Sequence, residues 1–192
     1  MPTNHQHSRG VGRLIVAADS DGFDDSETRV LTIVVELDEF CRRMYPRLVG
    51  ALSIMYTDLD LAEDLAQEAL SRAVERWDHV RSLDDPESYV IRIGFNLGRS
   101  WWRRRFAERR ARTRLGPATT WSDTDPTLDL EIRRILATLT ARQREAIVHR
   151  YYLGLDVKAS AASMGCAEGT VRALTSQGIA ALRSAGLGVD DE

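Results

Sequence analysis

The chain has 192 residues, of which 43% are hydrophobic and 29% charged, and its formal net charge is −3 at pH 7. This length allows one ordinary domain or two small ones, and the hydrophobic content is sufficient for a packed core. No segment approaches the ~18 consecutive apolar residues of a membrane span, and the first residues lack a signal-peptide pattern, so we expect a cytoplasmic protein without membrane insertion. Cys41 and Cys166 have no metal-ligand spacing, which argues against a disulfide framework, a zinc site or a metal cofactor.

Residues 1–30 are predicted to be a disordered or loosely docked acidic extension. Residues 1–39 hold eight acidic side chains against three arginines, and the segment is rich in His, Gly and Ser. Such a composition buries too little apolar surface to offset the entropy of ordering the chain. Residues 187–192 are expected to form an acidic tail.

Residues 31–114 are predicted to form a bundle of three or four helices. The first ends near Thr57, and its buried face recurs at three- and four-residue steps: Phe40, Met44, Leu48, Ala51, Leu52 and Met55. The second spans about Asp60 to Trp77, with an apolar side made of Leu61, Leu65, Ala69, Ala73 and Trp77. Its other side carries Glu63, Asp64, Gln67, Glu68, Ser71 and Arg72. An acidic exposed face is most often only solvated, and a binding role is the alternative.

The next helix follows a break over residues 78–85. Asp85-Pro86 marks its start, with Asp as the capping residue and Pro at the first helical position. The predicted core stripe is Val90, Ile93, Gly94, Leu97 and Trp101. A different face carries Tyr89, Arg92, Asn96, Arg99 and Arg103. Gly94 and Gly98 each lower the stability of the helix by about 1 kcal/mol relative to Ala, and the sequence shows no reason for their presence.

Positive charge is concentrated at the end of this helix. Between Arg99 and Arg114 there are eight arginines and one acid, Glu108, so this segment carries +7 in a chain whose net charge is −3. Guanidinium groups bind phosphate, and Trp102 offers a face for base stacking, since Trp101 continues the core stripe. The pattern favours binding to a polyanion that has exposed bases. The alternative interpretation is an Arg-rich helix end that is only solvated.

Asn96 lies in the middle of this helix, where Asn is unfavourable. Its amide can both donate to and accept from a base edge, which predicts a nucleic-acid contact. An exposed Asn tolerated by chance is the alternative interpretation.

A second helical domain is predicted at residues 128–186, after a flexible linker at residues 115–127 that contains two Pro and a Gly. The first helix of this domain carries Leu128, Ile132, Ile135, Leu136 and Leu139. Thr140 and Gln143 have the spacing of a capping box that opens the next helix, which ends at Gly154, and Asp156 caps a third.

The last two helices have the spacing of a helix-turn-helix. Ala161 is the small residue at the helix crossing, Gly165 suits the tight turn, and Val171 and Leu174 seat the second helix, expected at about residues 168–183. In a DNA major groove this helix would expose Thr170, Arg172, Thr175, Ser176 and Gln177.

The order of these parts resembles the extracytoplasmic-function (ECF) group of bacterial sigma-70-type sigma factors. The resemblance covers about residues 35–186 and rests on several motifs: FCRRMYPRL at Phe40–Leu48, AEDLAQEA at Ala62–Ala69, Ile93–Arg104 with its Asn, LTARQRE at Leu139–Glu145, RYY at Arg150–Tyr152 and GTVR at Gly169–Arg172.

The resemblance implies an all-α fold of two small domains, a region 2 helical bundle and a region 4 helix-turn-helix, joined by the flexible linker. It also implies a non-enzymatic protein that binds core RNA polymerase, through its clamp helices and flap, and melts promoter DNA. The residues expected to bind polymerase are Glu63, Asp64, Gln67 and Glu68. Those expected at the minus-ten element are His79, Arg81, Arg92, Asn96, Arg99, Trp102, Arg103 and Arg104. Those expected at the minus-thirty-five element are Thr170, Arg172, Thr175, Ser176 and Gln177. An anti-sigma factor is a further partner that the family suggests.

The chain departs from the family pattern at four places. One is the start of the first helix of the helix-turn-helix, at residues 157–161, where the family has a stronger acidic start. The family commonly has Asp where Ser100 stands and Ala where Gly94 stands, and several members have Arg near Ser176-Gln177. The predicted minus-thirty-five helix therefore has fewer cations than usual, which implies weaker binding to that element.

Two other function classes remain at this point. A helix-turn-helix regulator without a sigma role would explain the second domain, but it leaves the acidic helix and Asn96 without a function. An enzyme or an RNA-binding module has less support, because the sequence has no nucleophile-base pair, metal cluster or phosphate-binding loop.

Overall fold

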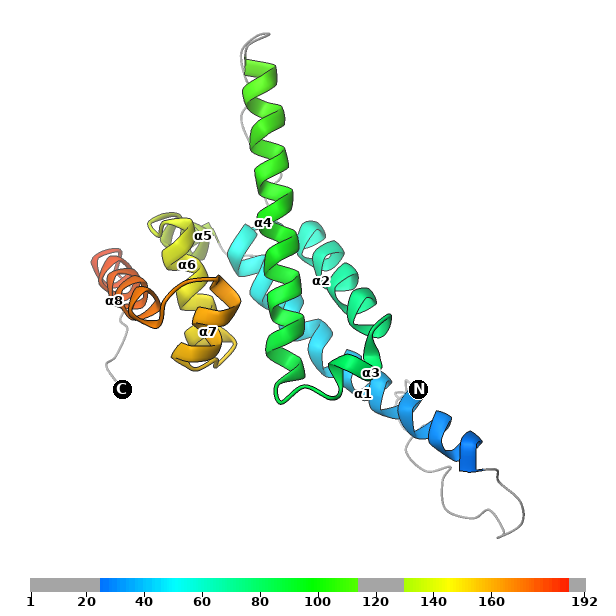
Figure 1. Ribbon diagram of the computed structural model, residues 1–192. Helices are drawn as coiled ribbons and strands as arrows, with labels where there is room; N and C mark the ends of the chain where they lie inside the picture. The colour runs from blue at the N-terminus through cyan, green and yellow to red at the C-terminus, as the bar shows by residue number, and fades with distance from the viewer. Residues whose placement is uncertain (1–24, 114–129, 187–192) are drawn as a thin grey trace, which may run out of the picture. The chain divides into compact units, whose positions relative to one another are not determined.

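The computed structural model describes residues 25–113 and 130–186, and every regular element within these ranges is a helix (Figure 1). The predicted all-α fold is confirmed. Residues 1–24, the linker predicted at 115–127 and the tail at 187–192 lie outside the described residues. The boundaries drawn for those three segments stay predictions.

Helix α1 (Asp25–Tyr56) carries the predicted buried face. Its six core residues are all buried: Phe40, Met44, Leu48, Ala51, Leu52 and Met55. The helix begins at Asp25, so residues 25–30, which the sequence assigned to the N-terminal extension, are helical. Arg43 Nε of α1 donates to the Glu87 carboxylate at 3.0 Å, and Arg47 pairs with the same carboxylate.

Helix α2 (Leu59–Val74) is shorter than predicted. Asp58 caps it by accepting a hydrogen bond from the backbone N–H of Leu61 at 2.9 Å. Trp77 opens a separate short helix, α3 (Trp77–Val80), inside the segment predicted as a break. Burial explains this helix, because Trp77 and Val80 both face the core and the Trp77 ring centroid lies 5.1 Å from that of Phe40.

Helix α4 (Pro86–Thr113) starts where the sequence predicted, with the Asp85 carboxylate accepting from the Ser88 N–H at 2.9 Å. Its core stripe was predicted only in part. Val90 and Gly94 are buried, whereas Ile93, Leu97 and Trp101 are half-buried. Two residues outside the predicted stripe, Ile91 and Phe95, are fully buried.

The reason is that α4 is covered on two sides. On one side, a Cβ at Gly94 would lie 3.4 Å from Leu48 Cδ2 of α1 and 3.7 Å from Ala69 Cβ of α2. On the other, the Phe95 ring centroid lies 4.3 Å from that of His149 in the second domain. A helix with a single apolar stripe is expected to pack on one side only, so the sequence pattern did not predict the contact of α4 with the second domain.

The second domain consists of α5 (Leu130–Ala137), α6 (Ala141–Ile147), a π-helical segment η1 (Val148–Tyr152), α7 (Val157–Met164) and α8 (Glu168–Ser184). Thr140 and Gln143 form the predicted reciprocal capping box. Asp156 Oδ1 accepts from the Ala159 N–H at 2.6 Å. Gly154 and Gly165 have φ angles of 69° and 63°, in the left-handed region that favours glycine.

The helix-turn-helix packing agrees with the sequence pattern. Ala161 and Val171 are buried in one cluster with Ala146 and Met164, and Leu174 packs against it. Helix α8 begins after Ala167, which makes no side-chain cap.

Helix α5 begins at Leu130, so Leu128 of its predicted apolar face lies outside the described residues. Leu136 and Leu139 of that face are buried together with Leu182 of α8, and Ile135 packs against them.

The structure explains why position 98 is a glycine, which the sequence did not reveal. A Cβ at Gly98 would lie 2.1 Å from the hydroxyl oxygen of Tyr56 and 2.4 Å from its Cζ, so the Tyr56 ring requires a glycine there. Tyr56 is itself buried, which leaves the ring little room to shift. Gly50 stands in the same relation to Tyr152, whose hydroxyl oxygen would lie 1.8 Å from an added Cβ.

We therefore expect opposite effects from alanine at the two glycines of α4. Gly98→Ala should lower the free energy of unfolding by about 1–3 kcal/mol through overpacking against Tyr56. Gly94→Ala should raise it by up to about 1 kcal/mol, because the new Cβ makes ordinary contacts and Ala favours the helix. Urea unfolding followed by circular dichroism measures both. Equal stability of the two variants would contradict this account of Gly98.

His149 makes stability depend on pH. Its Nδ1 lies 2.8 Å from the carbonyl oxygen of Glu145 and its Nε2 lies 2.8 Å from Ser163 Oγ. Burial lowers the pKa of His149 to about 4, against the hydrogen bond to the Glu145 backbone, which favours the charged ring. The unfolded chain, with a His pKa near 6.5, therefore binds more protons than the folded chain between these two values.

Folded stability should accordingly fall as the pH falls from about 6.5 toward about 4, by up to about 1.4 kcal/mol per pH unit from His149. His149→Phe should be less stable at pH 7, since it loses two hydrogen bonds, but should show a smaller loss between pH 6.5 and 4.5. Unfolding curves across this range test the difference in slope. An unchanged slope in the variant would show that other groups carry the dependence.

Candidate nucleic-acid interface

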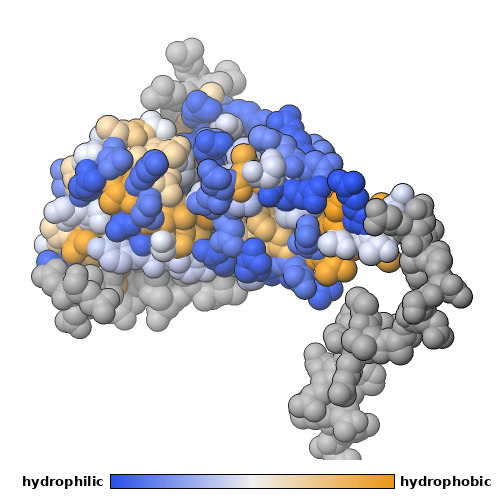
Figure 2. Space-filling model, turned by 60° about the horizontal axis from the view of Figure 1, so that its bottom comes forward, coloured by the Kyte–Doolittle hydropathy of each residue, from blue (hydrophilic) through white to orange (hydrophobic). Residues whose placement is uncertain are grey.

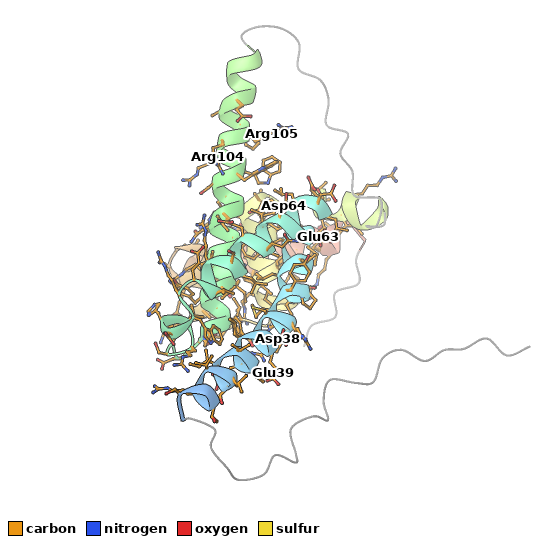
Figure 3. The ribbon with its side chains drawn as sticks, turned by 90° about the vertical axis from the view of Figure 1, so that its right-hand side faces the viewer. Asp38, Glu39, Glu63, Asp64, Arg104 and Arg105 are labelled. Carbon is orange, nitrogen blue, oxygen red and sulfur yellow. The ribbon has the colours of Figure 1, made fainter. Side chains whose placement is uncertain are left out.

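The predicted minus-ten residues of α4 differ in exposure. Arg92, Asn96, Arg103 and Arg104 are exposed, as predicted, whereas Arg99 is half-buried. Figure 3 shows Arg104 and Arg105 on the part of α4 that extends past α2. The guanidinium groups on this part are accessible to a phosphate backbone.

Trp102 is half-buried rather than free for stacking. Its ring is stacked with that of Tyr56 at 6.3 Å and lies 5.3 Å from that of Phe106, which is 54% exposed. Trp102 and Phe106 therefore form an aromatic pair on the same face of α4. The sequence pattern predicted a role for Trp102 but not for Phe106, although Phe106 lies four residues, or about one helical turn, after Trp102.

His79 and Arg81, predicted from the segment before α4, lie at the end of α3. The His79 ring packs edge-on against Tyr89 at 5.9 Å, and the Arg92 guanidinium lies 5.3 Å from the same Tyr89 ring. The fold thus brings His79 and Arg92 together around Tyr89. Arg81 forms an ion pair with Asp78 at 3.1 Å.

Arg99 lies at the centre of a polar network that the sequence did not predict. Its Nη2 donates to Asn96 Oδ1 at 2.5 Å and to the Ser163 carbonyl oxygen at 3.1 Å. Its Nη1 pairs with the carboxylate of Glu145, which is 2% exposed and also accepts from Arg142 Nη1 at 3.0 Å. No local signal marks Glu145, because its main partner is 46 residues away in sequence.

A cavity of about 1320 Å³ adjoins this network. Four arginines contribute to its lining, Arg99, Arg103, Arg142 and Arg144, together with the acid Glu145. Tyr56, Asn96, Trp102 and Phe106 line it as well. Burial raises the pKa of Tyr56, and the nearby Glu145 carboxylate acts in the same direction, so the phenol stays neutral at physiological pH.

The acidic face of α2 is accessible, as the sequence predicted. Asp64, Gln67 and Glu68 are exposed and Glu63 is half-buried, and Glu68 pairs with Arg72 at 2.8 Å. Figure 3 labels Glu63 and Asp64 on this helix and two further acids, Asp38 and Glu39, on α1.

The predicted minus-thirty-five residues lie on α8. Thr170, Arg172, Ser176 and Gln177 are exposed, and Thr175 is half-buried. A groove of about 380 Å³ runs beside the helix and is lined in part by Arg172, Thr175 and Ser176. Arg150 and Arg183 also line it, so this surface has more cations than Arg172 alone.

None of the described helices is long and apolar enough to cross a membrane. No group of three or more His, Cys, Asp or Glu side chains in the described part of the chain is arranged to hold a metal ion. The face in Figure 2 is mostly hydrophilic, with hydrophobic patches between polar side chains.

Two family models match the chain, each on one of the domains. Sigma-70 region 2 matches residues 40–108, and Sigma-70 region 4 matches residues 129–182. The first match includes α2 and the predicted minus-ten residues, and the second includes the helix-turn-helix.

Similar proteins belong to the same family. The RNA polymerase sigma-E factor of Streptomyces avermitilis is 29% identical over 151 residues, which cover 78% of this chain and 84% of that protein. The sigma-E factor of Streptomyces coelicolor is 27% identical over 151 residues, covering 78% and 85%.

A solved structure is similar over most of the chain. The sigma factor RpoE of Bartonella quintana, in complex with the anti-sigma factor NepR, superposes with a TM-score of 0.63 at 25% identity, over 87% of this chain and 99% of that one.

A regulator that binds DNA through a helix-turn-helix without a sigma role is not favoured, because the region 2 match covers the first domain as well. Both domains, in the order found here, are those of a factor that directs RNA polymerase to promoters. The chain therefore belongs to the ECF group of sigma-70-type factors and is an alternative sigma factor for transcription initiation.

Proposed function

We propose that α4 captures and melts the minus-ten element. The observation that carries this proposal is the exposed amide of Asn96, set on one helix with the exposed guanidinium groups of Arg92, Arg103 and Arg104. Asn96 would hold the edge of an extruded base while the arginines bind the strand's phosphates. Melting needs no hydrolysis, because base capture and backbone contacts offset an unstacking cost of a few kcal/mol per step.

The other two surfaces have complementary roles in this proposal. Helix α8 would enter the major groove of the minus-thirty-five element, with Arg172 reaching a base or phosphate and Arg150 and Arg183 binding the flanking backbone. The acidic face of α2, with Asp64 and Gln67 exposed, would bind the clamp helices of core polymerase. The flap of polymerase would bind the second domain.

The proposal also includes a cellular location and a further partner. A factor that acts on promoter DNA and polymerase works in the cytoplasm and has no enzymatic activity of its own. Because the similar RpoE was solved with an anti-sigma factor, an anti-sigma factor is a further partner that we propose for this chain.

Asn96→Ala should reduce open-complex formation on duplex promoters by about 5- to 150-fold, the equivalent of a base contact of ~1–3 kcal/mol. The variant should also lose its base preference, and this loss should be confined to one minus-ten position. Arg172→Ala is the control, since it should act only on promoters that have a minus-thirty-five element. Permanganate footprinting and run-off transcription with core polymerase measure these effects. A variant that lost only thermal stability would indicate a structural role for Asn96.

Asp64→Ala combined with Gln67→Ala should weaken binding to core polymerase, because both side chains are exposed and neither supports the core. Glu108→Ala is a matched control, since this exposed acid lies on α4 and not on α2. Pull-down with core polymerase tests binding, and circular dichroism tests folding. Unchanged binding in the double variant would refute the clamp assignment.

A further inference from the structure

We propose that the cavity beside Tyr56 is a binding site for a nucleotide, a small molecule that combines a flat base with several phosphates. The cavity has a volume of about 1320 Å³ and is lined by residues of α1, α4 and α6. Small-molecule sites commonly have about 300–1,000 Å³, so the space is ample. Arg103 and Trp102 also belong to the proposed promoter contacts, whereas Tyr56 and Arg144 have no part in them.

The first argument is a buried hydroxyl that lacks an acceptor. Tyr56 is 6% exposed and lines the cavity, yet no described residue forms a hydrogen bond with its hydroxyl oxygen. Burial raises the pKa of this phenol, and the nearby Glu145 carboxylate acts in the same direction, so the hydroxyl keeps its proton and is a donor. A buried polar group without a partner is unfavourable, and a ligand oxygen in the cavity would supply the acceptor.

Arg144, which also lines the cavity, holds a second donor without an acceptor. Its Nη1 donates to the Met55 carbonyl oxygen at 3.1 Å, and its Nη2 donates to the Leu136 carbonyl oxygen at 2.6 Å. Its buried Nε has no hydrogen-bond partner among the described residues. The two Nη contacts already fix the guanidinium, so a ligand that binds Nε does not have to order a free side chain. Because both unpartnered groups are donors, they favour a ligand rich in acceptors.

The charge of the lining favours an anion with more than one negative charge. Four guanidinium groups, those of Arg99, Arg103, Arg142 and Arg144, stand against one acid among the described lining residues, Glu145, which leaves a net charge of +3. Glu145 pairs with both Arg99 and Arg142, and one carboxylate cannot neutralise two guanidinium groups. Guanidinium forms paired hydrogen bonds with phosphate oxygens, and a phosphate monoester carries about −1.5 to −2. Several phosphates therefore match this lining better than one carboxylate does.

An aromatic surface on α4 lines the same cavity. Trp102 and Phe106 both contribute to it, with ring centroids 5.3 Å apart, and Phe106 is 54% exposed. The Trp102 ring is also stacked with that of the buried Tyr56, which holds it in place. A planar base gains from stacking on such rings, whereas inorganic phosphate makes no use of them. Cations and rings together therefore favour a nucleotide over a simple phosphate.

Calorimetric titration of the full chain with GTP, ATP, inorganic triphosphate and guanosine, at constant ionic strength, tests the class of ligand. GTP or ATP should bind at least tenfold more tightly than triphosphate and guanosine, because only a nucleotide uses both the cations and the rings. A smaller margin over either probe would mean a site for phosphate alone or for a base alone, and would overturn the proposal. Absence of GTP and ATP binding at millimolar concentration would overturn it as well.

Tyr56→Phe is the sharpest variant, because it removes the unpartnered hydroxyl and keeps the ring. It should lower nucleotide affinity about tenfold, the loss of one hydrogen bond to a charged group. Its stability without nucleotide should be unchanged or higher, since the hydroxyl has no partner among the described residues. Tyr152→Phe is the matched control, because this half-exposed hydroxyl is not part of the cavity lining. An equal effect of the two variants on affinity would overturn the proposal.

Two arginine variants separate the cavity from the general positive charge of α4. Arg103 lines the cavity, and Arg104, its exposed neighbour, is not among the lining residues. Arg103→Gln should lower nucleotide affinity about tenfold, and Arg104→Gln should lower it less than twofold. Equal losses would mean that nucleotides bind non-specifically to the arginines of this helix, which would overturn the proposal.

A fluorescent single-stranded minus-ten oligonucleotide distinguishes this site from the path of promoter DNA. Because Tyr56 is not one of the proposed promoter contacts, Tyr56→Phe should leave oligonucleotide affinity within about twofold of that of the unaltered chain. If oligonucleotide affinity fell as much as nucleotide affinity, the nucleotide would only be imitating the DNA strand. That result would overturn a separate nucleotide site and leave the proposed promoter role intact.

Discussion

The structure depends on helix α4 being packed from two directions at once. Small residues, Gly94 and Gly98, let α1 and α2 come close on one side, while Phe95 and Arg99 reach the second domain on the other. Between Val90 and Arg99 this packing leaves only Arg92 and Asn96 exposed, and both carry the proposed chemistry. Packing and recognition therefore compete for the surface of one helix.

The local features of the fold could be predicted from sequence because their causes are local. Asp85, Asp156 and the Thr140–Gln143 box cap helices through neighbours three residues away, and the buried face of α1 follows from its period. The helix-turn-helix could be predicted for the same reason, since Ala161, Gly165 and Val171 make their contacts within one pair of helices.

The errors arose where a residue's partner is distant in the chain. Phe95 and Ile91 fall outside a single apolar stripe, and only their burial on a second side explains them. Glu145 looks in the sequence like an ordinary polar residue of the LTARQRE stretch, and its buried pairing with Arg99 is visible only in the structure. The exposed site residues of α2, α4 and α8 could be predicted from residue type and spacing. The packing of His79 and Arg92 around Tyr89, and the pairing of Phe106 with Trp102, are visible only in the structure.

The π-helical segment η1 sets a limit on how this chain can change in length. The Leu153 N–H donates to the Val148 carbonyl oxygen at 2.9 Å, a spacing of five residues, so one residue more than in an α-helix fits between them. Deleting any residue of this segment would restore α-helical spacing and turn everything before it by about 100° relative to the Gly154 turn. His149 and Tyr152 would then point away from Phe95 and Gly50. Insertions and deletions in related chains should therefore avoid this stretch, even though part of it is exposed to solvent.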